Sequence, residues 1–330
     1  MGKALITGGS GFIGHHLIEH MLSTTDLEIV CLDRLDLSGN LSRLHEVVSG
    51  GENDWGSRVR FVFHDLKSEV NPFISNDIGE VNYILHLAAG SHVDRSIEDP
   101  MSFVMDNVVG TTNLLNYARS LDSLDLFINF STDEVFGPAP EGIKYKEWDR
   151  YDSTNPYSAS KAGAEEMCLA FANTYRIPLI VTHCMNVFGE RQHPEKFIPL
   201  CINKCLTGEK LYIHASPEGQ PGKRHYIHAR NTSAAVTFLM DGKWEQREKY
   251  NIVGEKELDN LELALIISNI LGKPLNYELL DFHSSRPGHD LRYALDGSKM
   301  SDLGWSLPVD FESSLEKCVN WTVNNNRWLG

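Results

Sequence analysis

Tyr157 and Lys161 form the pair of side chains in this sequence best suited to moving a proton. They stand four residues apart, so a helix presents both on one face. A free tyrosine has a pKa of about 10. A neighbouring ammonium favours the phenolate, which can take a proton from a hydroxyl while hydride leaves the same carbon. The alternative is a buried tyrosine beside a solvated lysine, because this spacing is common.

The run from Ser131 to Glu134 is a second candidate for proton chemistry. It follows an apolar stretch at 125–130 that predicts a strand, so it lies at the carboxyl end of that strand. Asp133 and Glu134, next to the hydroxyl of Thr132, suit paired work in which one carboxyl donates a proton and the other abstracts one. The alternative is a turn cap with two solvated acids.

A glycine-rich turn at 8–14 predicts a dinucleotide site. It stands between a strand pattern at 4–7 and a helical pattern at 12–22. Glycine permits a tight turn, close approach of a pyrophosphate to the backbone, and close packing of the helix. The helix N-terminus then offers its N–H groups to the phosphates. The alternative is a turn that binds nothing.

Asp33, about 20 residues further on, ends the next strand pattern, where a carboxylate binds ribose hydroxyls. Its charge repels a 2′-phosphate, so the sequence favours NAD over NADP, although Arg34 beside it weakens this preference. Small side chains after the fourth strand pattern let a cofactor lie across the strand ends. The predicted cofactor-binding residues are Gly8, Gly11, Phe12, Ile13, Gly14, Asp33, Asp65, Leu66, Leu87, Ala88, Ala89, Tyr157 and Lys161.

The first half of the chain alternates strand and helix patterns, which predicts a parallel sheet covered on both faces. The fold class is α/β, a Rossmann-like doubly wound parallel sheet with a smaller C-terminal α/β lobe for substrate. We expect residues 1–185 to form an NAD-binding domain, joined by a returning segment near 225–255, and residues 186–330 to form the second lobe. The strand patterns lie at 4–7, 28–32, 59–63, 83–87, 125–130 and 179–182, and the helical patterns at 12–22, 101–120 and 157–175.

The amino-acid composition of the chain limits the classes of molecule that it is expected to bind. Among 330 residues, Lys and Arg number 30 and Asp and Glu number 45, for a net charge of −15. This charge disfavours nucleic acid or an anionic membrane as the main partner. No apolar run reaches the roughly 18 residues of a membrane span. The six cysteines form no Cys-x-x-Cys pair and the N-terminus does not resemble a signal peptide, which predicts reduced thiols in a cytoplasmic protein.

Two pairs of potential metal ligands have helical spacing. His16 and His20 are four residues apart, as are Cys201 and Cys205. Neither pair has obvious further ligands, so we expect no metal site.

Ordered motifs run through nearly the whole chain. They are Gly8 to Gly14, Leu32-Asp33 followed by Gly39-Asn40-Leu41, Ser91 to Ser96, Asn107 to Thr111, Ser131 to Gly137, Tyr157 to Ala162, Pro194 to Pro199 and Arg286 to Asp290. On these motifs the chain resembles the extended short-chain dehydrogenase/reductase superfamily. Within it, the chain is similar to the nucleotide-sugar 4,6-dehydratases, which include the dTDP-glucose 4,6-dehydratases.

The resemblance implies a role for each catalytic candidate. Tyr157, with Lys161, removes the O4 proton of a nucleotide hexose as C4 gives hydride to NAD. Glu134 then takes the C5 proton, Asp133 protonates the C6 hydroxyl that leaves as water, and Thr132 hydrogen-bonds the C4 oxygen. Hydride returns to C6, so the product is a 4-keto-6-deoxy nucleotide sugar and NAD stays tightly bound.

Two related activities on the same scaffold stay open, a C4-epimerase and a UDP-glucuronate decarboxylase. The decarboxylases usually carry Ser in place of Asp133, and the epimerases lack the acid pair. This chain keeps both acids, so dehydration is favoured. A non-catalytic dinucleotide-sensing regulator is expected to have lost Tyr157, Lys161 or the acids, and none is lost.

The resemblance places the nucleotide diphosphate in the second lobe, where cations and amides suit a pyrophosphate and its base. We expect dTDP- or UDP-glucose. Tyr212 and His214 replace a proline and a tyrosine expected near the base, so another base stays open. For a lone cation the alternative is a solvated surface charge. The predicted substrate-binding residues are His92, Asn186, Lys196, Phe197, Arg224, Arg286 and His289.

Two helical patterns have apolar faces that fit a dimer interface, around 101–115 and 159–171. In the resembled family two such helices from each subunit form a four-helix bundle, so we expect a homodimer. The alternative is packing within the core of one subunit.

Overall fold

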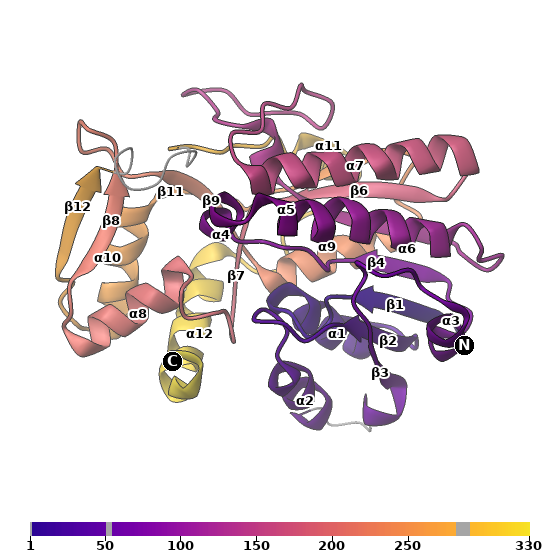
Figure 1. Ribbon diagram of the computed structural model, residues 1–330. Helices are drawn as coiled ribbons and strands as arrows, with labels where there is room; N and C mark the ends of the chain where they lie inside the picture. The colour runs from indigo at the N-terminus through magenta and orange to yellow at the C-terminus, as the bar shows by residue number, and fades with distance from the viewer. Residues whose placement is uncertain (1, 51–54, 282–290) are drawn as a thin grey trace.

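A seven-stranded parallel sheet dominates the computed structural model, which describes residues 2–50, 55–281 and 291–330 (Figure 1). The strand order within these ranges is β10-β6-β5-β4-β1-β2-β3, and it reverses between β1 and β4. This is the doubly wound Rossmann order, so the predicted fold class is confirmed. The strands are β1 (Lys3–Thr7), β2 (Glu28–Asp33), β3 (Val59–Phe63), β4 (Tyr83–His86), β5 (Leu126–Thr132), β6 (Leu179–Cys184) and β10 (Lys249–Ile252).

Helices cover both faces of this sheet, and two apolar clusters fill the layers between them. Strands enclosed in this way are apolar nearly throughout, which explains why continuous apolar runs in the sequence predicted them. The helices over one face are α1 (Phe12–Thr24), α2 (Leu41–Gly50) and α9 (Ala229–Met240). Those over the other are α3 (Pro72–Ile78), α6 (Gly110–Ala118) and α7 (Pro156–Tyr175).

The helix predicted at 101–120 is not one regular α-helix, so this prediction is wrong in detail. It consists of α5 (Pro100–Phe103), the π-helical turn η2 (Val104–Val109) and α6. Asn107, in the wide turn, is buried. Its amide accepts from the N–H of Gly90, 2.7 Å away, and donates to Oγ of Ser160 at 2.8 Å. Single π turns of this kind occur frequently at functional sites.

A smaller lobe lies over the carboxyl edge of the large sheet (Figure 1). It holds a three-stranded sheet in the order β11-β9-β7 and a two-stranded sheet of β12 and β8. Apolar side chains from three helices fill its core. Its elements are β7 (Asn186–Phe188), α8 (Phe197–Thr207), β8 (Leu211–Ala215), β9 (Lys223–His228), β11 (Glu257–Asp259), α10 (Asn260–Leu271), β12 (Tyr277–Asp281) and α12 (Phe311–Asn324).

The chain crosses between the two lobes more than once. It enters the small lobe after β6 and returns for α9, which packs on α1, and for β10, which pairs with β6. Short elements connect the rest of the described chain. They are η1 (Trp55–Arg58), α4 (Val93–Glu98), η3 (Asp133–Phe136), α11 (Ser298–Asp302) and η4 (Asn326–Trp328).

Candidate active site

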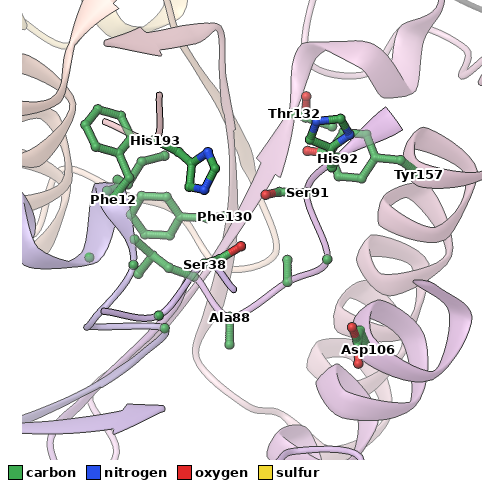
Figure 2. Close-up of a pocket in the computed structure, with 18 of the residues that line it drawn as sticks. Phe12, Ser38, Ala88, Ser91, His92, Asp106, Phe130, Thr132, Tyr157 and His193 are labelled. Carbon is green, nitrogen blue, oxygen red and sulfur yellow. The ribbon is translucent and has the colours of Figure 1, made fainter. Parts of the chain in front are cut away.

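A cavity of about 690 Å³ lies at the carboxyl edge of the large sheet, where the two lobes meet. Its walls include the turns after β1, β4 and β5, the start of α7 and the segment from 184 to 198. Figure 2 shows Phe12 and His193 on one side of the pocket and Thr132, His92 and Tyr157 on the other. This position, beside the reversal in strand order, is where doubly wound sheets bind their ligands.

The glycine turn after β1 has the shape that a pyrophosphate needs. Gly8 has a φ of +69°, which favours glycine. A Cβ on Gly14 would lie 2.2 Å from the carbonyl oxygen of Gly8, so α1 can pack this closely only with glycine there. Gly11 is the N-cap residue of α1, and no side chain caps the helix there. The first N–H groups of the helix are therefore left open at the cavity wall. The residues present therefore fit a dinucleotide.

Asp33 stands at the end of β2 and lines the same cavity. Its carboxylate accepts from the N–H groups of Ser10 and Leu35 at 3.0 and 2.9 Å, and burial raises its pKa. Arg34, which weakened the preference for NAD, is held by carboxylates: it forms a two-pronged contact with Asp106 and a further contact with Asp36. These acids occupy the guanidinium that would otherwise attract a 2′-phosphate.

The other predicted cofactor residues also line the cavity. Leu87, Ala88 and Ala89 follow β4, and the N–H of Ala88 donates to Oγ1 of Thr7 at 3.2 Å. Asp65 lies 3.5 Å from Arg34 and is partly exposed. The remaining members of this set that face the cavity are Phe12, Ile13, Leu66, Tyr157 and Lys161.

The start of α7 brings Tyr157 and Lys161 to the cavity wall. Asn155 fixes this start, because its side chain accepts from the N–H of Ser158 at 2.9 Å in a capping box. Lys161 is buried and donates to the carbonyl of Phe130 at 2.6 Å. Lys161 is therefore not the solvated lysine of the alternative interpretation, and burial lowers the pKa of its ammonium group.

The pKa of Tyr157 is raised in this protein, where the sequence predicted a lowered one. Burial is the main cause and the carboxylate of Glu134 adds to it, while a hydrogen bond with Thr132 opposes both. The lower pKa expected for Tyr157 depends in part on the positive charge of an oxidised nicotinamide, which the protein chain itself does not carry. The phenol therefore stays protonated until the cofactor site supplies positive charge.

Asp133 and Glu134 follow β5 as the short 3₁₀ turn η3 and face the cavity. Burial raises the pKa of Asp133 to about 6. Burial and the charge of Asp133 raise the pKa of Glu134 to about 7. Oδ1 of Asp133 accepts from Thr132 at 3.1 Å, and its buried Oδ2 has no hydrogen-bond partner among the described residues. This pair can hold one proton at neutral pH, which gives the site one acid and one base.

The roles that the family resemblance implies require the shared proton on Asp133 and an ionised Glu134. Nδ2 of Asn155 lies 3.3 Å from Oε2 of Glu134, and the hydroxyl of Tyr293 lies 3.5 Å from the same atom. Both groups stabilise the ionised form of Glu134. The contacts of Glu134 therefore suit the base, and the unpartnered Oδ2 of Asp133 is the position for a proton that a substrate hydroxyl can accept.

Sequence reasoning missed Asn155 and Tyr293. Asn155 carried a signal, because an asparagine followed by proline is typical of a helix start. Tyr293 carried none: it is 159 residues from Glu134 in the chain and only the fold brings the two together.

The predicted substrate residues divide into three groups. His92, Asn186, Lys196 and Phe197 line the cavity. Arg224 is not among the described residues that line it: it is buried, donates to two backbone carbonyls and stacks 4.5 Å from the ring of Tyr293. The last two, Arg286 and His289, lie outside the described residues.

The pairs with metal-like spacing have other contacts. His16 Nε2 lies 3.0 Å from the carbonyl of Glu190, and His20 Nε2 lies 3.1 Å from Oγ1 of Thr237. Across residues 2–50, 55–281 and 291–330 there is no group of three or more His, Cys, Asp or Glu side chains placed to hold a metal ion. In the same ranges no helix has the length and apolar character needed to cross a membrane.

Comparisons with known proteins agree with this architecture. Residues 5–318 match the family described as GDP-mannose 4,6 dehydratase. A dTDP-glucose 4,6-dehydratase of Escherichia coli is 37% identical over 99% of this chain and 95% of its own length. The structure of DesIV, a dTDP-glucose 4,6-dehydratase from Streptomyces venezuelae with NAD bound, is 34% identical, with a TM-score of 0.87 over 99% of this chain and 98% of its own. A UDP-glucose 4-epimerase from Thermus thermophilus, also with NAD, is 25% identical, with a TM-score of 0.85 over 96% of this chain and 98% of its own.

Proposed function

The chain belongs to the GDP-mannose 4,6 dehydratase family, and we propose that it is an NAD-dependent nucleotide-sugar 4,6-dehydratase acting on a dTDP-hexose. The substrate is dTDP-glucose or a close relative, and the product is the 4-keto-6-deoxy sugar nucleotide. The enzyme is a hydro-lyase, because the net reaction is the loss of one water.

One observation carries this proposal: Asp133 and Glu134 face the same cavity as Tyr157 and Lys161, and both acids have raised pKa values. Removing water across C5 and C6 needs a base for the C5 proton and an acid for the C6 hydroxyl. A buried carboxyl pair with one shared proton provides both. A C4-epimerase needs only the tyrosine and the cofactor, so it has no use for the pair.

NAD fits the glycine turn, Asp33 and the small side chains after β4. When bound it supplies a reversible hydride acceptor and a positive charge next to Tyr157. The protein's part is to hold it: Gly8, Gly11 and Gly14 make room for the pyrophosphate, and Asp33 hydrogen-bonds the adenosine ribose.

The catalytic side chains then move three protons. Tyr157, with the ammonium of Lys161, accepts the proton of the C4 hydroxyl, and Thr132 hydrogen-bonds the same oxygen. Glu134 removes the C5 proton, which the neighbouring ketone has acidified. Asp133 gives its proton to the C6 hydroxyl through Oδ2, so water leaves and a C5–C6 double bond forms. The stored hydride would then return to C6 and a proton to C5, which gives the saturated 4-keto-6-deoxy sugar.

The nucleotide part of the substrate belongs in the small lobe. We assign its diphosphate to Asn186, Lys196 and Phe197 on the cavity wall, with Arg224, Arg286 and His289 as further members predicted from the motifs. His92, on the large-lobe side of the cavity, is a further predicted substrate contact. The large lobe is residues 1–185 with the returning segment near 225–255, and the small lobe is the rest of 186–330. The choice of dTDP over UDP rests on the named activity of the relatives from Escherichia coli and Streptomyces venezuelae described above.

Incubating the purified protein with dTDP-, UDP-, GDP- and CDP-glucose and with UDP-glucuronate, and measuring product masses, tests the proposal. We expect loss of one water from dTDP-glucose. Unchanged mass with altered retention would identify an epimerase instead, and loss of carbon dioxide from UDP-glucuronate a decarboxylase. No change with any sugar, in a protein that holds NAD, would refute an enzymatic role on these substrates.

A homodimer through α5, η2, α6 and α7 is part of the proposal. Met101 on α5 and Val104 and Met105 on η2 are 64%, 38% and 37% exposed, and a second copy of the chain would cover these neighbouring apolar side chains. Light scattering of the wild type should give the mass of two chains, and Met101→Asp with Val104→Asp should give one. A cytoplasmic location is also proposed, since all six cysteines are unpaired and buried.

A further inference from the structure

A second cluster of buried ionisable groups lies behind the cavity. Its centre is Glu165 on α7, which is fully buried and stands one helical turn beyond Lys161. The carboxylate accepts hydrogen bonds from the hydroxyls of Ser131 on Oε1 and Tyr151 on Oε2. Nε2 of His183 lies 3.1 Å from the same Oε2. Neither Glu165 nor His183 lines the cavity, and no step of the proposed reaction uses them.

The contacts of His183 define which of its ring nitrogens can donate. Nδ1 lies 3.0 Å from Oδ1 of Asn251. The amide of Asn251 is fixed in this orientation, because its Nδ2 donates to the carbonyls of Tyr145 and Asp296, at 3.1 and 3.0 Å. The hydroxyl of Tyr151 also lies 3.2 Å from Nε2, but it donates its own proton to Glu165. An amide oxygen and a carboxylate therefore face the two ring nitrogens, and this geometry fits a ring that donates from both.

Glu165 is therefore the anion among several buried cations. Lys249 Nζ lies 3.7 Å from its Oε2 and also donates to the hydroxyl of Tyr151. Burial lowers the pKa of both Lys249 and Lys161, and Glu165 opposes the fall in each. Burial acts to raise the pKa of Glu165, but His183, Lys249 and Ser131 hold it below its usual value. The negative charge of Glu165 thus helps to keep its neighbours protonated.

Two short links join Glu165 to the reacting groups. Ser131, which donates to it, comes directly before Thr132 and the acid pair on β5. Lys161 lies on the same face of α7, four residues earlier, and donates to the carbonyl of Phe130 on the same strand. A change in charge at Glu165 therefore acts on both the lysine and the strand end.

We propose that Glu165, as an ion pair with His183, is a positioning residue that keeps Lys161 charged and holds the end of β5 in its working place. The catalytic consequence rests on the proposed dehydratase function, whereas the charge state of the pair does not. The ionisable groups around the pair are Lys161 and Cys168 on α7, Tyr151 before α7, Asp133 after β5 and Lys249 on β10, with Cys184 on β6 beside Lys161. The exposed Glu166 acts on Tyr151 and Lys249 and is not among the groups that shift the pKa of Glu165 or Lys161.

Nitrogen NMR of the full-length protein labelled at histidine tests the charge state without any turnover. In the wild type, both ring nitrogens of His183 should carry protons at neutral pH. In Glu165→Gln the amide can donate to Nε2, so the ring should become neutral with one bare nitrogen. A bare ring nitrogen on His183 in the wild type would overturn the ion pair, whatever the protein's activity.

The pH profile of kcat tests the effect on the site. At high pH kcat should decline as Lys161 loses its proton, because Tyr157 then lacks the neighbouring positive charge. Glu165→Gln should move this decline to lower pH by about 1 to 2 units, because an opposite charge close to Lys161 is lost. The matched control is Glu166→Gln, which removes the same charge at the next, exposed position and should leave the decline in place. Glu165→Asp should also keep it, even at a reduced kcat, because the charge remains.

A purely structural role gives a different result. It predicts that Glu165→Gln lowers kcat by the same factor at every pH, and this outcome would overturn the proposal. If the wild type fails to dehydrate any nucleotide sugar, the proposed function fails, and the spectrum of His183 still decides whether the ion pair exists.

Discussion

Asp133→Asn should stabilise the cofactor-free protein at high pH while it damages catalysis. Folding raises the pKa of Asp133 from 3.8 to about 6, mainly through burial. The ionised carboxyl is thus disfavoured in the fold, and wild-type stability falls as pH rises from about 3.8 to 6. Each unit of difference between the two pKa values is worth about 1.4 kcal/mol, so above pH 7 the ionised carboxyl lowers the free energy of unfolding by about 3 kcal/mol. At about pH 4 this loss of stability is only roughly half a kcal/mol.

Urea unfolding at about pH 4 and pH 8 measures this effect. Relative to wild type, the variant should gain about 2 to 3 kcal/mol more stability at pH 8 than at pH 4. Any fixed cost of placing an amide beside Thr132 is equal at both pH values and cancels. The matched control is Asp122→Asn on the exposed surface, which should show no such difference. An equal change in stability at both pH values would refute the reasoning that burial raises this pKa.

Four further changes follow from the geometry of the site. Glu134→Gln should stop exchange of the C5 proton with deuterated solvent, while reduction of the cofactor stays visible in the nicotinamide absorbance. Gly14→Ala should lower the NAD recovered from purified protein at least about tenfold, because the new Cβ would meet the carbonyl of Gly8 at 2.2 Å. Tyr157→Phe should slow cofactor reduction by about 10²- to 10⁴-fold in stopped flow, with the Kd for the nucleotide sugar unchanged within about threefold. Asp33→Ser should raise NADP affinity relative to NAD by about tenfold in a direct binding assay, because a like charge is removed from the 2′ position.

The large sheet was predictable because most of its strands are buried on both faces. Such strands are nearly continuous apolar runs, and each of the six predicted ones is present to within a few residues. The break at η2 was not predictable from apolar periodicity, because it involves the side chain of Asn107 reaching Gly90 and Ser160 across the fold. The apolar periodicity of the sequence predicts a helix in this segment. The π-type hydrogen bonding of η2 is accompanied by contacts with residues that are distant in the sequence.

The site was predictable where its residues are close in sequence. Tyr157 with Lys161, and Asp133 with Glu134, share a helix face or a turn, so spacing alone suggests their chemistry. Charge states were not predictable, because they depend on burial and on residues from other elements. The pKa of Tyr157 is raised by Glu134 as well as by burial, and the ring of His183 is oriented by Asn251 on a neighbouring strand.

Transfer of deuterium within dTDP-glucose labelled at C4 tests the dehydratase mechanism most directly. The predicted product has lost one water and carries the deuterium on its C6 methyl group, because the hydride that leaves C4 returns to C6 in the same site. Mass spectrometry and proton NMR of the product measure both features. Deuterium retained at C4 in a sugar of unchanged mass and inverted C4 configuration would contradict dehydration and identify an epimerase.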